Sequence, residues 1–153
     1  MKTPASLLAL VLVLIAGCSN ATTIGPVPDT NDGSQVWRGL SAKINSSAWV
    51  ADNATASNRS GQTTISASGA GESIGISFAT VSAPGTMTFN TRVVGNYSSG
   101  VNSYSTDGNA NAGTLTITEV DATHIAGRFS FTAAETQTLD LVKVTSGTFN
   151  ILF

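Results

Sequence analysis

The chain has few of the residues from which catalytic centres and metal sites are built. Its 153 residues include one cysteine and one histidine, and only 10% of the residues are charged. A disulfide framework needs an even number of cysteines, and a zinc site needs a cluster of Cys or His ligands. The composition therefore excludes both kinds of site, and we expect no metal and no cofactor.

Positive charge is also scarce. Six basic residues follow Lys2, against nine acidic residues, and the six form no run along the chain. A nucleic-acid-binding domain needs a basic stripe, and a polybasic membrane contact needs a cluster of lysines and arginines. We therefore expect no nucleic-acid partner and no polybasic contact with lipid. The six residues are Arg38, Lys43, Arg59, Arg92, Arg128 and Lys143.

The single cysteine lies at the end of an N-terminal apolar segment. Lys2 is followed by an apolar run over residues 5–17, which is the pattern of a secretory signal peptide and is too short to span a bilayer. The sequence Ile15-Ala16-Gly17-Cys18 resembles the lipobox of bacterial lipoproteins, in which the cysteine is lipidated and becomes the mature N-terminus. The alternative is an ordinary signal peptide with an incidental cysteine.

The lipobox resemblance also implies a location. Ser19 stands where an aspartate retains some lipoproteins in the inner membrane, so we expect a lipid anchor in the outer membrane, with the leaflet left open. Residues 18–36 are rich in Gly, Pro, Asn, Asp, Ser and Thr and have no hydrophobic period, which is typical of a flexible tether. The prediction is a signal peptide over residues 1–17, a tether over 18–36 and one domain over 37–153.

Hydrophobic residues in this domain alternate with polar ones. The stretches 63–68, 73–80, 86–90, 113–118 and 125–133 all have the period of two that is typical of half-buried strands, and no helical period is present. The pattern predicts an all-β domain, an antiparallel meander of about 8–10 strands that forms a β-sandwich or a flattened barrel.

The alternation also predicts registers, because a slip of one residue reverses the two faces of a strand. Leu115 should lie opposite Phe131 and Ile117 opposite Phe129, with residues 122–124 as the connection. An even connection over residues 69–72 should join the strands of Ile65 and Ile76. A bulge at residues 146–147 should allow the last segment to be one long, kinked strand, with a hairpin turn there as the alternative.

The phase of the large apolar residues gives a candidate core. Burying these side chains would suffice for one domain without disulfides. The predicted core consists of Leu40, Ile44, Trp49, Ile65, Ile74, Ile76, Phe78, Met87, Phe89, Leu115, Ile117, Ile125, Phe129, Phe131, Leu139, Leu141, Val144, Phe149 and Ile151.

Two stretches resemble a family of small Gram-negative envelope lipoproteins that contain a domain of unknown function. "LSAKINSSAWVA" (residues 40–51) is similar to the family's A-K-I-N-G-x-x-W opening. "AGRFSFTA" and "VTSGTFNILF" are similar to its G-T-F-x-F-x-A and T-x-G-x-F-N-V strands. The chain departs at Ser46, where the family usually has glycine, and at Arg128, where small or hydroxylated residues are common. The resemblance implies an envelope location and a β architecture, and it implies no catalytic residues.

The polar residues that could carry chemistry form weak patterns. His124 and Asp121 lie in a predicted turn without a nucleophile-elbow serine, and Glu119 and Asp121 are a carboxylate pair without a neighbouring row of aromatic residues. Asp107, with Asn109 and Asn111, begins a calcium-loop spacing but lacks its glycine and its final glutamate. We expect ordinary turns at these positions, and we expect the protein not to be an enzyme.

Binding residues are expected in the long polar stretch 95–113, with an ordinary long hairpin that has a poorly alternating strand around residues 101–105 as the alternative. Tyr97 and Tyr104 are the only tyrosines of the chain, and a tyrosine on a loop can stack on a sugar and donate a hydrogen bond. Trp37 precedes the first strand without a phased partner, so it is a further ligand-binding candidate. The expected function is a non-catalytic binding or structural module of the envelope that contacts carbohydrate or a small apolar ligand. The alternative is a calycin-like carrier with an apolar interior cavity.

Overall fold

The computed structural model describes residues 38–109, 112–135 and 137–153. Within these ranges the chain forms strands and no helix, so no described segment is a helix that could cross a membrane. The strands are β1 (Gly39–Ile44), β2 (Ser47–Val50), β3 (Asn53–Arg59), β4 (Gln62–Gly69), β5 (Glu72–Ala79), β6 (Gly85–Thr88), β7 (Val94–Ser99), β8 (Asn102–Ser105), β9 (Gly113–Val120), β10 (His124–Glu135) and β11 (Leu141–Leu152).

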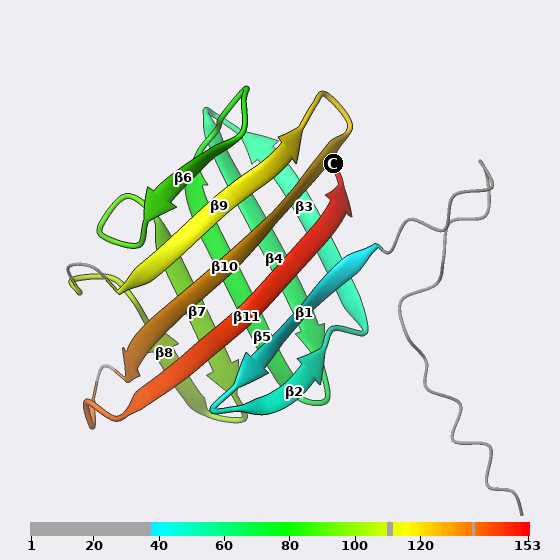
Figure 1. Ribbon diagram of the computed structural model, residues 1–153. Coiled ribbons are helices and arrows are strands. Elements are labelled where there is room, and N and C mark those ends of the chain that lie inside the picture. The colour runs from blue at the N-terminus through cyan, green and yellow to red at the C-terminus, as the bar shows by residue number, and fades with distance from the viewer. Residues whose placement is uncertain (1–37, 110–111, 136) are drawn as a thin grey trace, which may run out of the picture.

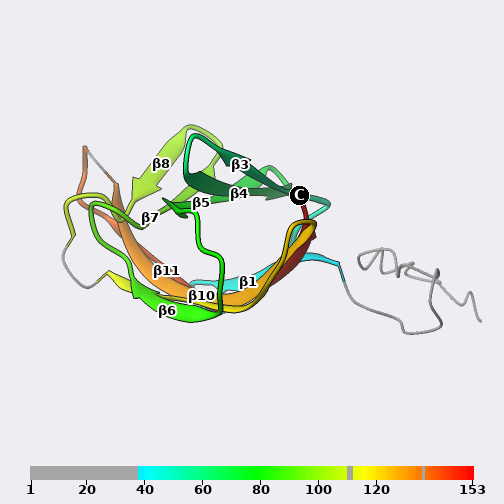
Figure 2. The same ribbon diagram turned by 90° about the horizontal axis from the view of Figure 1, so that it is seen from above.

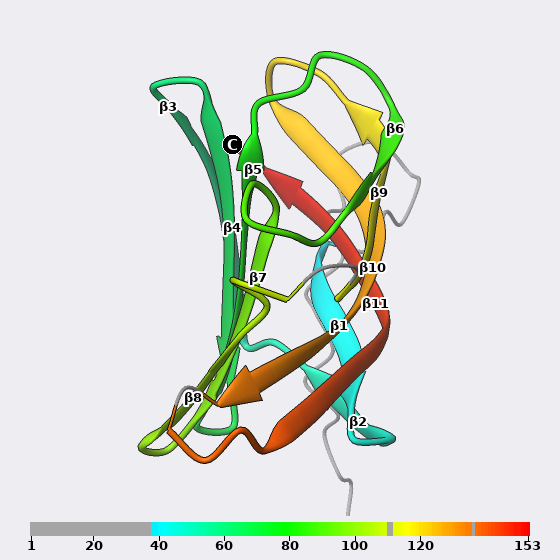
Figure 3. The same ribbon diagram turned by 90° about the vertical axis from the view of Figure 1, so that its left-hand side faces the viewer.

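All the strands belong to one antiparallel sheet that curls into a half-barrel with two layers. The front layer, which faces the viewer in Figure 1, contains β2, β1, β11, β10, β9 and β6. The back layer contains β8, β7, β5, β4 and β3. Figures 2 and 3 show the two layers facing each other across the core. The predicted all-β antiparallel class is confirmed, with eleven strands in the described residues instead of 8–10.

The two layers are joined differently at their two sides. At one side β10 pairs with β9 over most of its length, and then its last residues Ala134 and Glu135 pair with β8. At the other side the chain crosses from β2 to β3, where Ala51 N donates to Leu40 O at 2.9 Å and Asp52 N donates to Ser68 O at 2.8 Å. Beyond this crossing β3 pairs only with β4, so the half-barrel is open along the outer edge of β3.

Most of the predicted core is buried between the layers. Fully enclosed side chains include Leu40, Ile65, Phe78, Phe89 and Leu115, each with 0% exposure. Met87 is half-buried at the rim of the core. The predictions for Leu139 and Leu141 are wrong, because these side chains are 74% and 62% exposed. Leu139 lies in the turn before β11, and β11 directs its even-numbered residues inward at that end, so Val142 takes the core position.

Two G-x-F sequences explain how the long strands of the front layer pack. Gly127 pairs with Phe149, and Phe129 pairs with Gly147, so each ring lies over the glycine of the opposite strand. An added Cβ at Gly127 would lie 2.6 Å from Cζ of Phe149, and one at Gly147 would lie 2.5 Å from Cζ of Phe129. The pairs are reciprocal, and the centroids of the two rings are 6.3 Å apart. The glycines therefore provide the space that the rings occupy.

The registers agree with the sequence in one hairpin and differ in another. Ile65 pairs with Ile76 in the β4–β5 hairpin, as predicted. In the β9–β10 hairpin Leu115 pairs with Phe129 instead of Phe131, because Val120 pairs with Ile125 and a bulge follows. The expected faces are kept, since the shift is an even number of residues.

The bulge predicted near the end of the chain is present. Between Phe129 and Phe131 of β10, the partner on β11 moves from Gly147 to Val144, so β11 has one extra residue there. Ser146 adopts φ 51 at this position. Because of this extra residue, the inward-pointing residues of β11 are even-numbered before the bulge and odd-numbered after it. β11 is one long, kinked strand, as expected.

Tight turns with positive φ join three of the hairpins. The central residues are Asn45 and Ser46 in the β1–β2 turn, Ser60 and Gly61 in the β3–β4 turn, and Ala70 and Gly71 in the β4–β5 turn. Positive φ at both positions is the type I′ geometry that matches the twist of paired strands. The second position is glycine in two turns and Ser46, with φ 76, in the other. The family pattern that the sequence resembles has glycine at this place, which relieves the strain of a Cβ.

Replacing Ser46 with glycine is expected to stabilise the protein. Glycine adopts φ 76 without a Cβ clash, and the gain should be about 1 kcal/mol in the free energy of unfolding. Urea denaturation followed by circular dichroism measures it. Ser47→Gly, in the adjacent strand position with ordinary backbone angles, is the control and should destabilise. A loss of stability in Ser46→Gly would contradict the assignment of strain to this turn.

Candidate functional site

Two of the sequence-derived site residues lie outside the described residues. Cys18 and Trp37 fall within residues 1–37, as do the predicted signal peptide and tether. The lipidation of Cys18 and the ligand contact of Trp37 therefore stay predictions. The described fold begins at Arg38, immediately after this segment.

The two tyrosines lie on strands and not on a long loop. Residues 94–105 form the β7–β8 hairpin, in which Tyr97 pairs with Tyr104. Tyr97 faces the interior with 5% exposure, and its hydroxyl donates to Glu72 Oε1 at 2.5 Å. Burial, reinforced by this hydrogen bond, raises the pKa of Tyr97 to about 12. Tyr104 is half-buried with its ring centroid 5.7 Å from that of Tyr97. Tyr97 therefore presents no open ring face on which a sugar could stack.

The residues considered for catalysis form local contacts. His124 Nε2 lies 2.6 Å from Asn150 Oδ1. The Asp121 carboxylate accepts hydrogen bonds from Thr123 N at 2.7 Å and from the Thr123 hydroxyl at 2.9 Å, and these bonds lower the pKa of Asp121. Glu119 pairs with Ala126 on the outside of the front layer. The described residues contain no group of three His, Cys, Asp or Glu side chains that could hold a metal ion, and Asn111 of the calcium-loop pattern lies outside them.

The interior is occupied by phenylalanine rings. Phe89 and Phe131 pack with their ring centroids 5.1 Å apart, and both rings lie against Gly95 of the back layer. An added Cβ at Gly95 would lie 3.0 Å from either ring. This contact brings the two layers together at the centre of the half-barrel, which gives no support to the apolar cavity that the carrier alternative requires.

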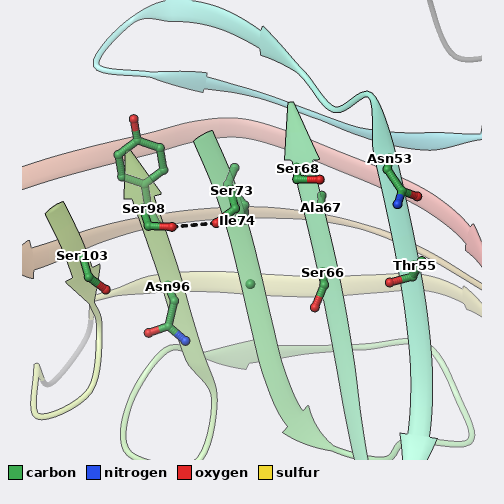
Figure 4. A pocket seen from close by; sticks show the side chains of 12 residues that line it. Asn53, Thr55, Ser66, Ala67, Ser68, Ser73, Ile74, Asn96, Ser98 and Ser103 are labelled. Atoms are coloured by element: carbon green, nitrogen blue, oxygen red, sulfur yellow. Dashed lines mark hydrogen bonds between the residues drawn. The ribbon is translucent and has the colours of Figure 1, made fainter. Parts of the chain in front are cut away.

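The outer face of the back layer has an unusual composition. Side chains that alternate with the core residues form three uncharged rows across the strands. A shorter row beyond them, Arg59, Gln62 and Ala79, carries the charge of Arg59. The three uncharged rows are Asn53, Ser68, Ser73, Ser98 and Ser103, then Thr55, Ser66, Gly75, Asn96 and Ser105, then Ser57, Thr64, Ser77 and Val94. We call these fourteen residues the polar face. Figure 4 shows its serine, threonine and asparagine side chains on one side of the sheet.

The polar face is hollowed at its centre. A pocket of about 290 Å³ lies over β3, β4, β5, β7 and β8. Most of its lining belongs to the first two rows, and Ala67, Ile74 and Tyr97 complete it. Gly75 stands in the middle of the second row, and an added Cβ there would have its nearest contact at 3.9 Å, with Asn96. The absence of a side chain at Gly75 therefore deepens the surface between Ser66 and Asn96.

The polar face can donate and accept hydrogen bonds over a wide area. Serine and threonine hydroxyls and asparagine amides each provide a donor and an acceptor. Only Ser73 and Ser98 bond to each other across this face, at 2.7 Å, among the contacts of the described residues. Neighbouring strands are about 4.8 Å apart, so a row of five residues spans roughly 19 Å. Such a surface suits an extended, uncharged ligand that is rich in hydroxyl groups.

The sequence contains a signal for this face in the outward positions of its strands. The outward positions of stretches 63–68 and 73–80 are mostly Ser and Thr, and the stretch 95–105 continues the pattern with Asn and Ser. The alternation shows which residues point outward. It does not show that five strands set them side by side.

Comparison with known proteins gives one match. A family model for a domain of unknown function, DUF6252, matches residues 38–152. No curated protein and no solved structure matches the chain significantly. The resemblance to a domain of unknown function is thus confirmed, while the lipoprotein character expected with it stays a prediction. Since the match covers all but one of the residues from Arg38 onwards, the chain belongs to the DUF6252 family.

Proposed function

We propose that this protein is a lipid-anchored, non-catalytic module of the outer membrane that binds a neutral polysaccharide on its polar face. The observation that carries the proposal is the three rows of uncharged hydroxyl and amide side chains on five adjacent strands. Among the described residues on this side of the back layer, a charged ligand would find an ionic partner at Arg59 alone, at the end of β3 beyond the third row. A sugar polymer offers the same kind of donors and acceptors that the rows offer.

The absence of charge and of exposed aromatic rings on this face fits an extended ligand better than a small one. One hydrogen bond contributes only about 0.5–1.5 kcal/mol net, because it replaces bonds to water. Useful affinity therefore requires many bonds along the ligand, and the length of the rows provides for them. An immobilised protein that binds a repeating polymer also gains from rebinding, since neighbouring sites have a high effective concentration.

The anchor is proposed from the lipobox-like sequence at Cys18. Several acyl chains on one cysteine hold a protein firmly on a membrane, whereas a single chain binds marginally. The expected result is that the intact protein fractionates with outer membranes and incorporates labelled palmitate. Cys18→Ala should abolish incorporation and release the protein from the membrane. Palmitate label in Cys18→Ala would contradict lipidation at this residue.

Binding to polysaccharide can be tested by affinity electrophoresis in gels that contain neutral glucans, mannans or galactans. At least one of these polymers should retard the protein. Ser66→Glu, which places a charge beside the hollow at Gly75, should remove most of the retardation. Thr114→Glu is the matched control, because it adds the same charge to an exposed position of β9 on the front layer. Equal migration of the two variants, or no retardation by any neutral polymer, would refute the proposed ligand class.

A further inference from the structure

The outer face of the front layer collects basic side chains that are far apart in the sequence. Lys43 pairs with Thr145, and Asn45 N donates to Lys143 O at 2.8 Å, so Lys43 and Lys143 are diagonal neighbours on the same side of the sheet. Arg128 pairs with Thr148 farther along β11. All three side chains are exposed and alternate with buried residues. Half of the six basic residues after Lys2 thus lie on this one face, which Figure 1 shows from the front.

These three charges are not neutralised locally. Within the described part of the chain, none of the three forms an ion pair. The register places one carboxylate on this face, that of Glu119, at the far end of β9. The other acidic residues of the described ranges lie at turns, strand ends or the β2–β3 crossing. The face therefore has a net positive charge, although the chain as a whole is acidic.

The same face exposes aliphatic side chains. Val50, Leu141 and Leu152 are 46%, 62% and 49% exposed. Val50 lies at the end of β2, and the two leucines lie at the two ends of β11, so the three side chains surround the basic residues. No large apolar side chain of the polar face is as exposed as these. Aliphatic groups combined with lysine and arginine are characteristic of surfaces that lie in the interface of an anionic membrane.

A small hollow at the bulge completes the face. It has a volume of about 160 Å³, and its lining includes Lys143 together with the residues Ser130, Thr132 and Thr145. An ammonium group beside hydroxyl donors is a suitable environment for a phosphate oxygen. The extra residue of β11 creates this hollow, because it separates the strands locally between Phe129 and Phe131.

We propose that the front layer lies on an anionic phospholipid surface, with the headgroup phosphates at Lys43, Lys143 and Arg128. The positive charge of the face is complementary to anionic headgroups, and the exposed aliphatic side chains contact the upper part of the lipid acyl chains. The two outer faces then have separate roles, since the polar face points away from the membrane. The inference is independent of the polysaccharide proposal and of lipidation, because it concerns the attraction of the folded domain itself.

The test is flotation of the mature chain, residues 18–153 with Cys18→Ser, with vesicles made of equal parts of phosphatidylglycerol and phosphatidylethanolamine. The protein should float with these vesicles at low salt and remain behind with phosphatidylcholine vesicles. Raising the ionic strength should release it, because salt screens exposed charges. Each basic side chain near an anionic surface contributes about 1 kcal/mol, so Lys43→Gln with Lys143→Gln should weaken binding roughly 30-fold.

The matched control is Arg59→Gln with Arg92→Gln, which removes the same charge from positions outside the front-layer face. It should bind much as the unaltered chain does. Equal weakening in the two double variants would show a general charge effect and would overturn the proposal. So would flotation with phosphatidylcholine, or no flotation with the anionic vesicles. Circular dichroism of each variant verifies that the fold is intact.

Discussion

Gly147→Ala is expected to lower the free energy of unfolding by about 3 kcal/mol. The added Cβ would lie 2.5–2.6 Å from three ring carbons of Phe129, a separation at which the atoms overlap. The ring is 3% exposed and is confined by Phe131 and Phe149, so it cannot move aside without disturbing the core. Overpacking of a filled core costs about 1–3 kcal/mol, and this site combines it with a strand position next to the bulge. Urea denaturation followed by far-ultraviolet circular dichroism measures the loss.

Two further variants separate this steric cause from a general effect of alanine. Gly85→Ala is the control, since an added Cβ there would meet nothing within 4 Å, and its stability should change little or increase slightly. Adding Phe129→Leu to Gly147→Ala should restore part of the loss, because a smaller side chain leaves space for the Cβ. Strict additivity of the two substitutions would show that the glycine and the ring do not interact.

Trp49→Ala should lower the free energy of unfolding by about 3–5 kcal/mol and loosen the β2–β3 crossing. Trp49 lies at the end of the front layer with 6% exposure, and its indole Nε1 donates to Gly69 O of the back layer at 3.1 Å. The backbone of Val50 and Asp52 lies against Gly69, where an added Cβ would be 2.8 Å from Val50 O. The indole therefore holds the crossing against the end of β4. Amide hydrogen exchange should show faster exchange in β3 of the variant than in β10.

Trp49→Phe tests how much of this effect comes from the hydrogen bond. The ring is kept, but Gly69 O loses a donor in a buried position, which should cost about 1–3 kcal/mol. A variant that is as stable as the original chain would show that the indole acts through packing alone. Accelerated exchange in all strands alike, in either variant, would contradict a local role at the crossing.

Much of the fold could be predicted from the period of the apolar residues. The alternation in residues 63–80 predicted the strands, their faces and the pairing of Ile65 with Ile76, because only a connection with an even number of residues keeps both on one face. The turn itself is residues 70–71, shorter than the predicted connection over 69–72. The reversal of phase around Ser146 predicted the bulge in β11. These features depend on neighbours along the chain or on one hairpin, so one sequence contains the information they need.

The errors occurred where distant strands decide the outcome. Leu139 and Leu141 are apolar, but the turn before β11 and the bulge place the even-numbered residues against the core. The β9–β10 register shifted because a bulge near Glu119 changes the pairing beyond it. β9 ends at Val120, so the strand is too short after this bulge for the alternation to show a reversal of phase. For the stretch 95–113 the sequence left a binding loop and a long hairpin as alternatives, and the structure has the hairpin. Its strands are rich in serine and asparagine, so their hydrophobic signal is weak.

The two candidate binding faces also depend on the pairing of distant strands, which one sequence does not reveal. The sequence places serine and threonine outward on individual strands, but the order β8-β7-β5-β4-β3 makes them a continuous surface. Lys43 and Lys143 are 100 positions apart, and they become neighbours because β1 pairs with β11. Charge that is scattered along a chain can thus be concentrated on one side of a sheet, so the expectation that the protein makes no polybasic contact with lipid considered only runs in the sequence.

The pairing of β1 with β11 also determines the order in which the domain can assemble. β3, β4 and β5 follow one another as hairpins and can pair as soon as they have been synthesised. β1 is the first of the described strands, yet one of its two partners is β11, the last of them. Contacts of such large sequence separation form late, since a long loop must be closed before they are gained. The front layer is thus completed only after β11 has been synthesised, and until then Leu40 and Ile44 lack the strand that covers them.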